Sequence, residues 1–156
     1  MTPDELIAHY GLEPIPREGG LFRRTWAGPE GPDGRPAGTA VVALLTAGDH
    51  SALHRLPTDE TWHFYLGDPL ELLLLLAPDG TSRTAVLGPD VLSGQAVQFT
   101  VPAHTWMGGR TRGDWTLFGC TMAPGFTYAD YAHGDRADLT ARYPHEAARI
   151  AELCRP

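Results

Sequence analysis

The stretch GDHSALHRLPTDETWHFYLG, residues 48–67, places three potential ligand-binding side chains at the start of an apolar strand pattern. His54, Glu60 and His63 fall within ten positions, and a Gly-Asp-Pro turn follows at residues 67–69. Imidazole and carboxylate groups together are typical of metal sites and of acid–base sites. A histidine bonded to a nearby carboxylate can also be purely structural, so the stretch leaves both alternatives open.

Short apolar or alternating runs continue on both sides of this stretch, over residues 39–121. They read TAVVALLT, TWHFYLG, LELLLLLAPDG, RTAVLGPD, AVQFTVPA and TLFGCTMAPG, with turn signals between them. Runs of this length and spacing predict an all-β sandwich or barrel. Five consecutive leucines, residues 72–76, predict a strand covered on both faces, because Pro69 and the turn at 78–80 limit the run to the length of a strand.

Helical patterns flank the predicted strands. Near the N-terminus, Thr2 and Glu5 form a capping box, and Gly11 ends the pattern. Residues 143–154, YPHEAARIAELC, return to helical spacing with a proline near the start. The Gly- and Pro-rich segment 27–38 predicts an exposed loop that is too short to divide domains. We therefore expect a single domain over residues 1–156.

Composition limits the classes of partner. The 156 residues include 19 acidic and 12 basic side chains, and the arginines are scattered, so no basic face is available for nucleic acid. The longest apolar run, LELLLLLAP, is far shorter than the ~20 residues of a membrane helix. The N-terminal sequence shows no signal peptide, and two cysteines are too few to hold a secreted fold together. We expect a cytoplasmic protein with a small-molecule partner and no membrane contact.

The quoted stretch resembles the first signature of the cupin superfamily. That signature reads Gly, five residues, His, one residue, His, three or four residues, Glu, six residues, Gly. Gly48, His54, Glu60 and Gly67 match it, and Leu56 replaces the second histidine.

The second cupin signature is matched less well by GQAVQFTVPAHTWM, residues 94–107. Pro102 fits, whereas His104 stands at the glycine position and Met107 at the histidine position. Two of the four metal ligands that the resemblance implies are therefore absent from their usual places.

Four blocks together are similar to the small, largely uncharacterised fifth cupin family. They are EGGLFRRTW (18–26), LLTAGDHSALHRLPTDETWHFYLGDPLEL (44–72), VPAHTWMGG (101–109) and GCTMAPGFTYADY (119–131). This branch is similar in fold to deoxysugar epimerases and usually has Gly at position 104 and Gln at 107. The resemblance implies an all-β cupin double-stranded β-helix, or jelly-roll barrel, with a short N-terminal helix and a C-terminal helix. It also implies a homodimer.

One interpretation of the cluster is a site for one divalent metal ion, Fe, Mn, Ni or Zn, with His54, Glu60 and His63 as ligands. Side chains alternate along a strand, so an inward Glu60 brings Trp62 inward and turns His63 outward unless a bulge intervenes. His104 is a further candidate for the third ligand.

The other interpretation needs no metal. His54 acts as a general base because its ordinary pKa, near ~6.5, suits proton abstraction at neutral pH, and Glu60 orients it. Tyr65 completes the expected catalytic set. The resemblance to sugar epimerases implies removal of a proton next to a carbonyl, followed by reprotonation.

The expected pocket walls combine aromatic and polar side chains. The candidate substrate-binding residues are Glu18, Arg23, Trp62, Phe64, Gln98, Phe99 and Trp106. We expect an enzyme of the isomerase or epimerase, cyclase or lyase type acting on a small oxygenated metabolite. The alternatives are a ligand-binding or sensing cupin without catalysis and, with less support, a storage-like structural dimer.

Overall fold

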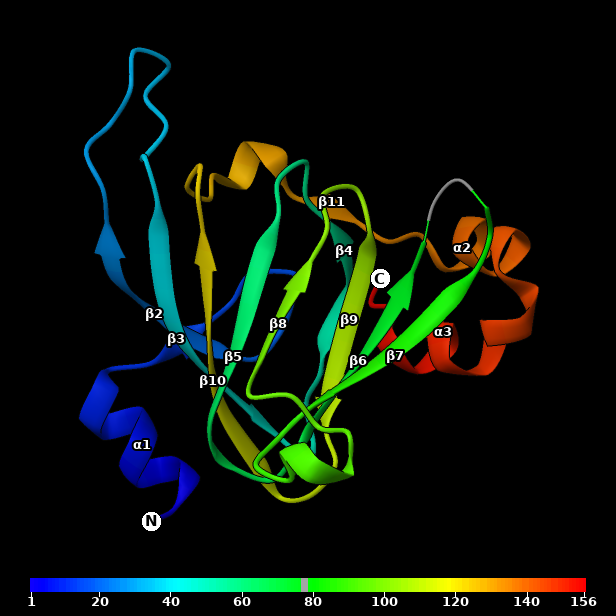
Figure 1. Cartoon of the computed structure of the whole chain (residues 1–156), viewed down its shortest axis with the longest axis horizontal. Coiled ribbons are helices and arrows are strands. Elements are labelled where there is room, and N and C mark those ends of the chain that lie inside the picture. The colour runs from blue at the N-terminus through cyan, green and yellow to red at the C-terminus, as the bar shows by residue number, and fades with distance from the viewer. Residues whose placement is uncertain (77–78) are drawn as a thin grey trace.

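Two antiparallel sheets pack face to face in the computed structural model, which describes residues 1–76 and 79–156 (Figure 1). In spatial order, the first sheet contains β1 (Glu13–Pro14), β2 (Leu21–Ala27), β3 (Thr39–Thr46), β10 (Trp115–Met122), β5 (Glu60–Gly67) and β8 (Gln98–Val101). The second sheet contains β11 (Ala132–His133), β4 (Ser51–Arg55), β9 (Trp106–Thr111), β6 (Leu70–Leu75) and β7 (Ser82–Leu87). This arrangement confirms the prediction of an all-β jelly roll.

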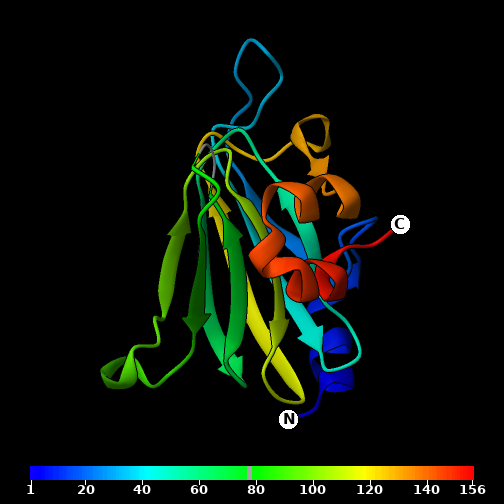
Figure 2. The same cartoon turned by 90° about the vertical axis from the view of Figure 1, so that its right-hand side faces the viewer.

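The α-helices lie near the ends of the chain and outside the sandwich. They are α1 (Pro3–Tyr10), α2 (Arg136–Arg142) and α3 (Ala147–Leu153), with short 3₁₀ helices η1 (Val91–Ser93), η2 (Tyr128–Asp130) and η3 (Pro144–Glu146). Figure 2 shows α2 and α3 against the outer face of the five-stranded sheet. None of the described helices has the length and apolar character needed to cross a membrane.

The expected ends of α1 are confirmed. The Thr2 hydroxyl accepts a hydrogen bond from the Glu5 backbone, and the Thr2 backbone N–H donates to the Glu5 carboxylate at 2.7 Å. Gly11 takes the left-handed conformation, with φ of 62°, that ends the helix.

The C-terminal region contains more helix than the sequence pattern indicated. Helix α2 begins where the Asp135 side chain accepts a hydrogen bond from the backbone N–H of Asp138. The expected helix over 143–154 is present as α3, preceded by the 3₁₀ turn at Pro144. The sequence of residues 136–142, RADLTAR, shows no strong apolar periodicity, because Leu139 is its single large apolar residue and the single buried residue of α2.

The leucine strand β6 is buried on both faces, as predicted. Leu72 and Leu74 belong to the core between the two sheets. Leu73 and Leu75 point the other way, into a second core that α2 and α3 cover. Leu76 follows the strand, and Pro78 of the predicted turn lies outside the described residues.

The strand core makes a quantitative prediction. Leu72→Ala leaves a cavity between the sheets, and we expect it to lower the free energy of unfolding by about 2–5 kcal/mol. Leu92→Ala is the matched control because Leu92 is 98% exposed, so its effect should stay within about 0.5 kcal/mol. Urea unfolding followed by tryptophan fluorescence measures both values. Equal effects of the two substitutions would contradict the assigned core.

Candidate functional site

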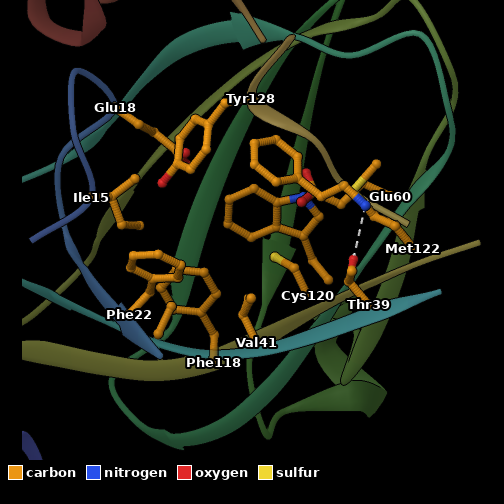
Figure 3. A pocket seen from close by; sticks show the side chains of 13 residues that line it. Ile15, Glu18, Phe22, Thr39, Val41, Glu60, Phe118, Cys120, Met122 and Tyr128 are labelled. Carbon is orange, nitrogen blue, oxygen red and sulfur yellow. Dashed lines mark hydrogen bonds between the residues drawn. The ribbon is translucent and has the colours of Figure 1, made fainter. Parts of the chain in front are cut away.

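A small cavity opens on the inner face of the six-stranded sheet (Figure 3). The centre of a water molecule can occupy about 70 Å³ of it. Its walls come from the segment before β2, strands β2, β3, β5 and β10, and the segment after β10. The lining residues are Ile15, Glu18, Phe22, Thr39, Val41, Ala43, Glu60, Trp62, Phe118, Cys120, Met122, Phe126 and Tyr128. Most of these side chains are apolar, and Glu18 and Glu60 are the two carboxyl groups among them.

Glu60 is the central polar group of the cavity. Strand β5 turns its side chain inward, where it is only 9% exposed and its Oε2 has no hydrogen-bond partner among the described residues. Burial raises the pKa of Glu60 to about 7, with a lowering influence from His54 and a raising influence from Glu18. The carboxyl group therefore exchanges its proton near neutral pH.

Trp62 and Cys120 form the immediate surroundings of the Glu60 carboxyl group. The Trp62 ring stacks on Phe118 with 5.1 Å between ring centroids, and both rings line the cavity. Burial and the adjacent Glu60 raise the pKa of the Cys120 thiol well above its ordinary value, so Cys120 stays neutral. Glu60 thus lies among an aromatic wall and a neutral thiol rather than beside a fixed positive charge.

His54 lies next to the cavity on strand β4. Its Nδ1 donates a hydrogen bond to the Ala52 carbonyl at 2.7 Å, which leaves Nε2 directed at Glu18, 3.8 Å from Oε1. The Ser51 hydroxyl donates to the same Glu18 oxygen at 2.7 Å. Tyr131 stacks on the imidazole, with ring centroids 5.3 Å apart. His54 is thereby fixed in one orientation and contacts the cavity through Glu18.

The backbone around Glu18 is held from a distant part of the chain. Arg155 donates from Nε to the Glu18 carbonyl at 3.2 Å and forms an ion pair with Asp49. Asp49 in turn accepts a hydrogen bond from the Gly20 backbone at 2.7 Å. Gly20 has a φ of 76°, which a side chain would strain. These contacts position the Glu18 carboxylate at the cavity wall.

His63 lies on the opposite face of β5 from Glu60. Its Nδ1 accepts a hydrogen bond from the Gln98 amide at 3.2 Å, and its Nε2 lies 2.8 Å from the Thr121 hydroxyl. Burial lowers the pKa of His63, so the ring is neutral at pH 7. The structure therefore does not bring His63 together with His54 and Glu60, and Gln98 is also outside the cavity.

A bulge is present in β5, but it follows His63. Gly119 of β10 pairs with His63 and Phe118 with Phe64, and the register then shifts so that Leu117 pairs with Leu66. Tyr65 is the extra residue, 44% exposed on the outer face. The bulge thus leaves the alternation from Glu60 to His63 intact, and Tyr65 does not reach the proposed site.

The remaining candidates are distributed over the fold. Arg23 is exposed on β2, and Trp106 packs beneath the C-terminal helices on the far face of the second sheet. Phe64 and Phe99 pack at the edge of the core between the sheets. Glu18 and Trp62 are the expected substrate-binding residues that line the cavity.

Other lining residues were not singled out from the sequence. Phe126 and Tyr128 lie in an irregular segment after β10, where no strand periodicity indicates which side chains point inward. The Phe126 backbone N–H donates to the Thr39 hydroxyl at 3.0 Å and ties this segment to β3. Figure 3 shows Tyr128 of the same segment at the cavity. The only sequence signal was their place in the family-like block 119–131.

A family model described as "Cupin superfamily (DUF985)" matches residues 4–134. The chain belongs to the cupin superfamily. Protein SO0799 from Shewanella oneidensis is similar over 100% of this chain and 99% of its own, with 34% identity and a TM-score of 0.93. A hypothetical protein from Leishmania major is similar over 100% of both chains, with 29% identity and a TM-score of 0.89.

More distant cupins share the fold alone. An oxalate decarboxylase structure is 15% identical, with a TM-score of 0.56, over 92% of this chain and 37% of its own. No curated protein matches the chain.

The residues of this cupin do not fit the metal site that the superfamily implies. Leu56 and Met107, at the positions of two usual histidine ligands, are buried apolar side chains. Among residues 1–76 and 79–156, no three His, Cys, Asp or Glu side chains are placed to hold a metal ion.

The raised pKa of Glu60 predicts a pH-dependent stability. Folding moves this pKa from 4.5 to about 7, so the folded protein binds the extra proton and the contribution of Glu60 to stability is lost as pH rises between these values. Each tenfold change in proton affinity is worth about 1.4 kcal/mol, which gives roughly 3 kcal/mol in total. Glu60→Gln, which does not titrate, should become more stable than the wild type by up to this amount. Urea unfolding from pH 4.5 to 8 measures the difference, and a constant difference would contradict the burial of an ionisable Glu60.

The neighbours of Glu60 predict the sign of two further changes. Glu18→Gln removes a negative charge and should lower the pKa of Glu60, whereas His54→Gln removes a stabilising imidazole and should raise it. Carbon-13 NMR titration of the glutamate side-chain carboxyls reports the pKa directly. Glu152→Gln is the control, because Glu152 is an exposed carboxylate paired with Arg110. Shifts of the same sign in the first two variants would refute the arrangement.

Proposed function

We propose that this cupin is an enzyme that moves a proton on a small oxygenated metabolite, in a reaction of the isomerase, epimerase or lyase type. The observation that carries the proposal is the buried Glu60 carboxyl group in an aromatic cavity, whose Oε2 has no hydrogen-bond partner among the described residues; burial raises the pKa of this group to about 7. A buried group tuned to neutral pH is typical of general acids and bases.

The cavity supplies two carboxyl groups with different surroundings. Glu60 is the proton-transferring group: ionised, it takes a proton next to a carbonyl, and protonated, it returns one to the substrate. Glu18 accepts a hydrogen bond from Ser51 and faces His54, so it is suited to hold a substrate hydroxyl. His54 then acts as a positioning residue for Glu18, a different role from the general base expected from the sequence.

The apolar walls strengthen this chemistry. Trp62, Phe118 and Phe126 surround the carboxyl group with apolar surface, and charges interact more strongly in a less polar environment. The narrow space favours a substrate that places only a few atoms beside Glu60.

Proton exchange with solvent tests the proposal without knowledge of the full reaction. In D₂O, the wild-type enzyme should incorporate deuterium next to the carbonyl of a substrate from a panel of small hydroxy-aldehydes, hydroxy-ketones and uronic acids, followed by proton NMR. Glu60→Gln keeps the size of the side chain and should slow exchange by about 10²–10⁴-fold. Tyr65→Phe, on the outer face, should leave the rate unchanged. Exchange that persists in Glu60→Gln would refute the assignment.

A binding protein without catalysis is the second candidate. The replacement of two usual cupin histidines by Leu56 and Met107 favours it, because these positions carry the chemistry in metal-dependent members of the superfamily. A metabolite that copurifies with the protein, binds in the cavity and exchanges no deuterium would support this function instead.

A further inference from the structure

A wide groove adjoins the cavity at Phe126 and Tyr128. The two hollows have five lining residues in common, Phe22, Thr39, Val41, Phe126 and Tyr128. The groove also contains Gly11, Glu13, Arg23 and Arg24, and it admits the centre of a water molecule over about 620 Å³. A ligand that enters the cavity beside Tyr128 therefore extends into this groove if it is larger than a few atoms.

The two arginines of the groove form few contacts with the rest of the protein. Arg23 donates one hydrogen bond to the Tyr10 carbonyl and Arg24 one to the Phe126 carbonyl, each at 3.4 Å. Within the described part of the chain, neither has a carboxylate within ion-pair distance. By contrast, Arg112, Arg149 and Arg155 are all held by carboxylates.

Tyr128 lines both the cavity and the groove. Burial raises the pKa of its phenol, the charge of Glu18 raises it further, and the charge of Arg24 lowers it. The phenol of Tyr128 is thus influenced by Glu18 of the cavity and by Arg24 of the groove. Glu13 is exposed in the same groove, and with it two positive charges face one negative charge.

This distribution of charge favours a ligand that places an anionic group in the groove and an uncharged end in the cavity. An anionic group placed in the cavity would face Glu18 and, above neutral pH, an ionised Glu60. Arg23 and Arg24 are consecutive on β2, so they leave opposite faces of the strand, and both line the groove. An anionic group placed there meets guanidinium groups, which bind carboxylates and phosphates through paired hydrogen bonds.

We propose that the ligand of this cupin carries a carboxylate or phosphate group that Arg23 and Arg24 bind in the groove, while its uncharged oxygenated end passes Tyr128 and reaches Glu60. The inference rests on the proposed function, because it assigns a substrate class to the same site. It also gives Arg23 a role outside the cavity and adds Arg24, which the sequence pattern did not single out.

Three compounds with the same carbon chain test the inference by isothermal titration calorimetry. They are glycerol 3-phosphate, glycerate and glycerol, titrated at constant ionic strength so that general screening is unchanged. At least one of the two anions should bind about tenfold or more tightly than glycerol, and the stronger of them identifies phosphate or carboxylate as the preferred group. The Arg23→Gln, Arg24→Gln double variant should lose this preference and bind glycerol as before.

Arg136→Gln is the matched control, because Arg136 is an exposed arginine at the start of α2, away from the groove. It should keep the preference for anions. Equal binding of the three compounds to the wild type, or an anion preference that survives in the double variant, would overturn the inference. The single variants Arg23→Gln and Arg24→Gln replace the double variant if thermal melting shows that it does not fold.

Glu60→Gln separates this inference from the proposed function. It should retain the anion preference, because the groove is unchanged, and lose deuterium exchange. If exchange survives in Glu60→Gln while the arginine variants lose anion binding, the proposed proton transfer fails and the groove assignment stands. If exchange is lost but the arginine variants bind anions normally, the groove assignment fails and the proton transfer stands.

Discussion

The alternation of side chains along β5 is the constraint on which the site depends. Because successive residues point to opposite faces, one register places Glu60 and Trp62 between the sheets and His63 outside. A shift by one residue would exchange the two sets and put an imidazole and a phenol into the cavity. Pairing with β10 fixes the register through residue 64, and the bulge at Tyr65 comes too late in the strand to alter it.

Burying Glu60 costs stability, and the surroundings show how the fold tolerates this cost. The carboxyl group is protonated in part at neutral pH, which reduces the penalty of placing a charge among aromatic rings. The large apolar core, with its doubly covered leucine strand, supplies the surrounding stability. Glu60 destabilises the fold, yet a regular strand holds it in an inward position. A destabilising polar group at a fixed inward position is typical of a functional residue.

Much of the fold follows from local patterns. Turn spacing predicts the strands, the Thr2 capping box predicts α1, and the length of the leucine run predicts β6, since each depends on neighbours in sequence. The inward direction of Glu60 also follows from alternation. Alternation carries a further consequence for β9, where position 107 is a cupin ligand position: an inward Met107 requires Trp106 to point outward, as the structure shows.

Sequence patterns are less informative where the site is built from irregular segments. Tyr128 and Tyr131 lie in or beside the 3₁₀ turn η2, and Glu18 lies in a loop shaped by glycine conformations, so no periodicity indicates their direction. Their placement depends on contacts between distant segments, such as the hydrogen bond from Arg35 to the Gly125 carbonyl. Physical reasoning on neighbouring residues cannot supply such contacts.

The tie between Arg155 and the Glu18 loop has a consequence for the order of assembly during synthesis. Glu18 leaves the ribosome early, whereas Arg155 is made 137 residues later, and β3 must also wait for its partner β10. The nascent first half therefore carries apolar strands whose hydrogen-bonding edges have no native neighbour during elongation. The Glu18 loop gains its contact with Arg155 only after translation has passed residue 155, so a ribosome stalled before that point would display a nascent chain that lacks this tie.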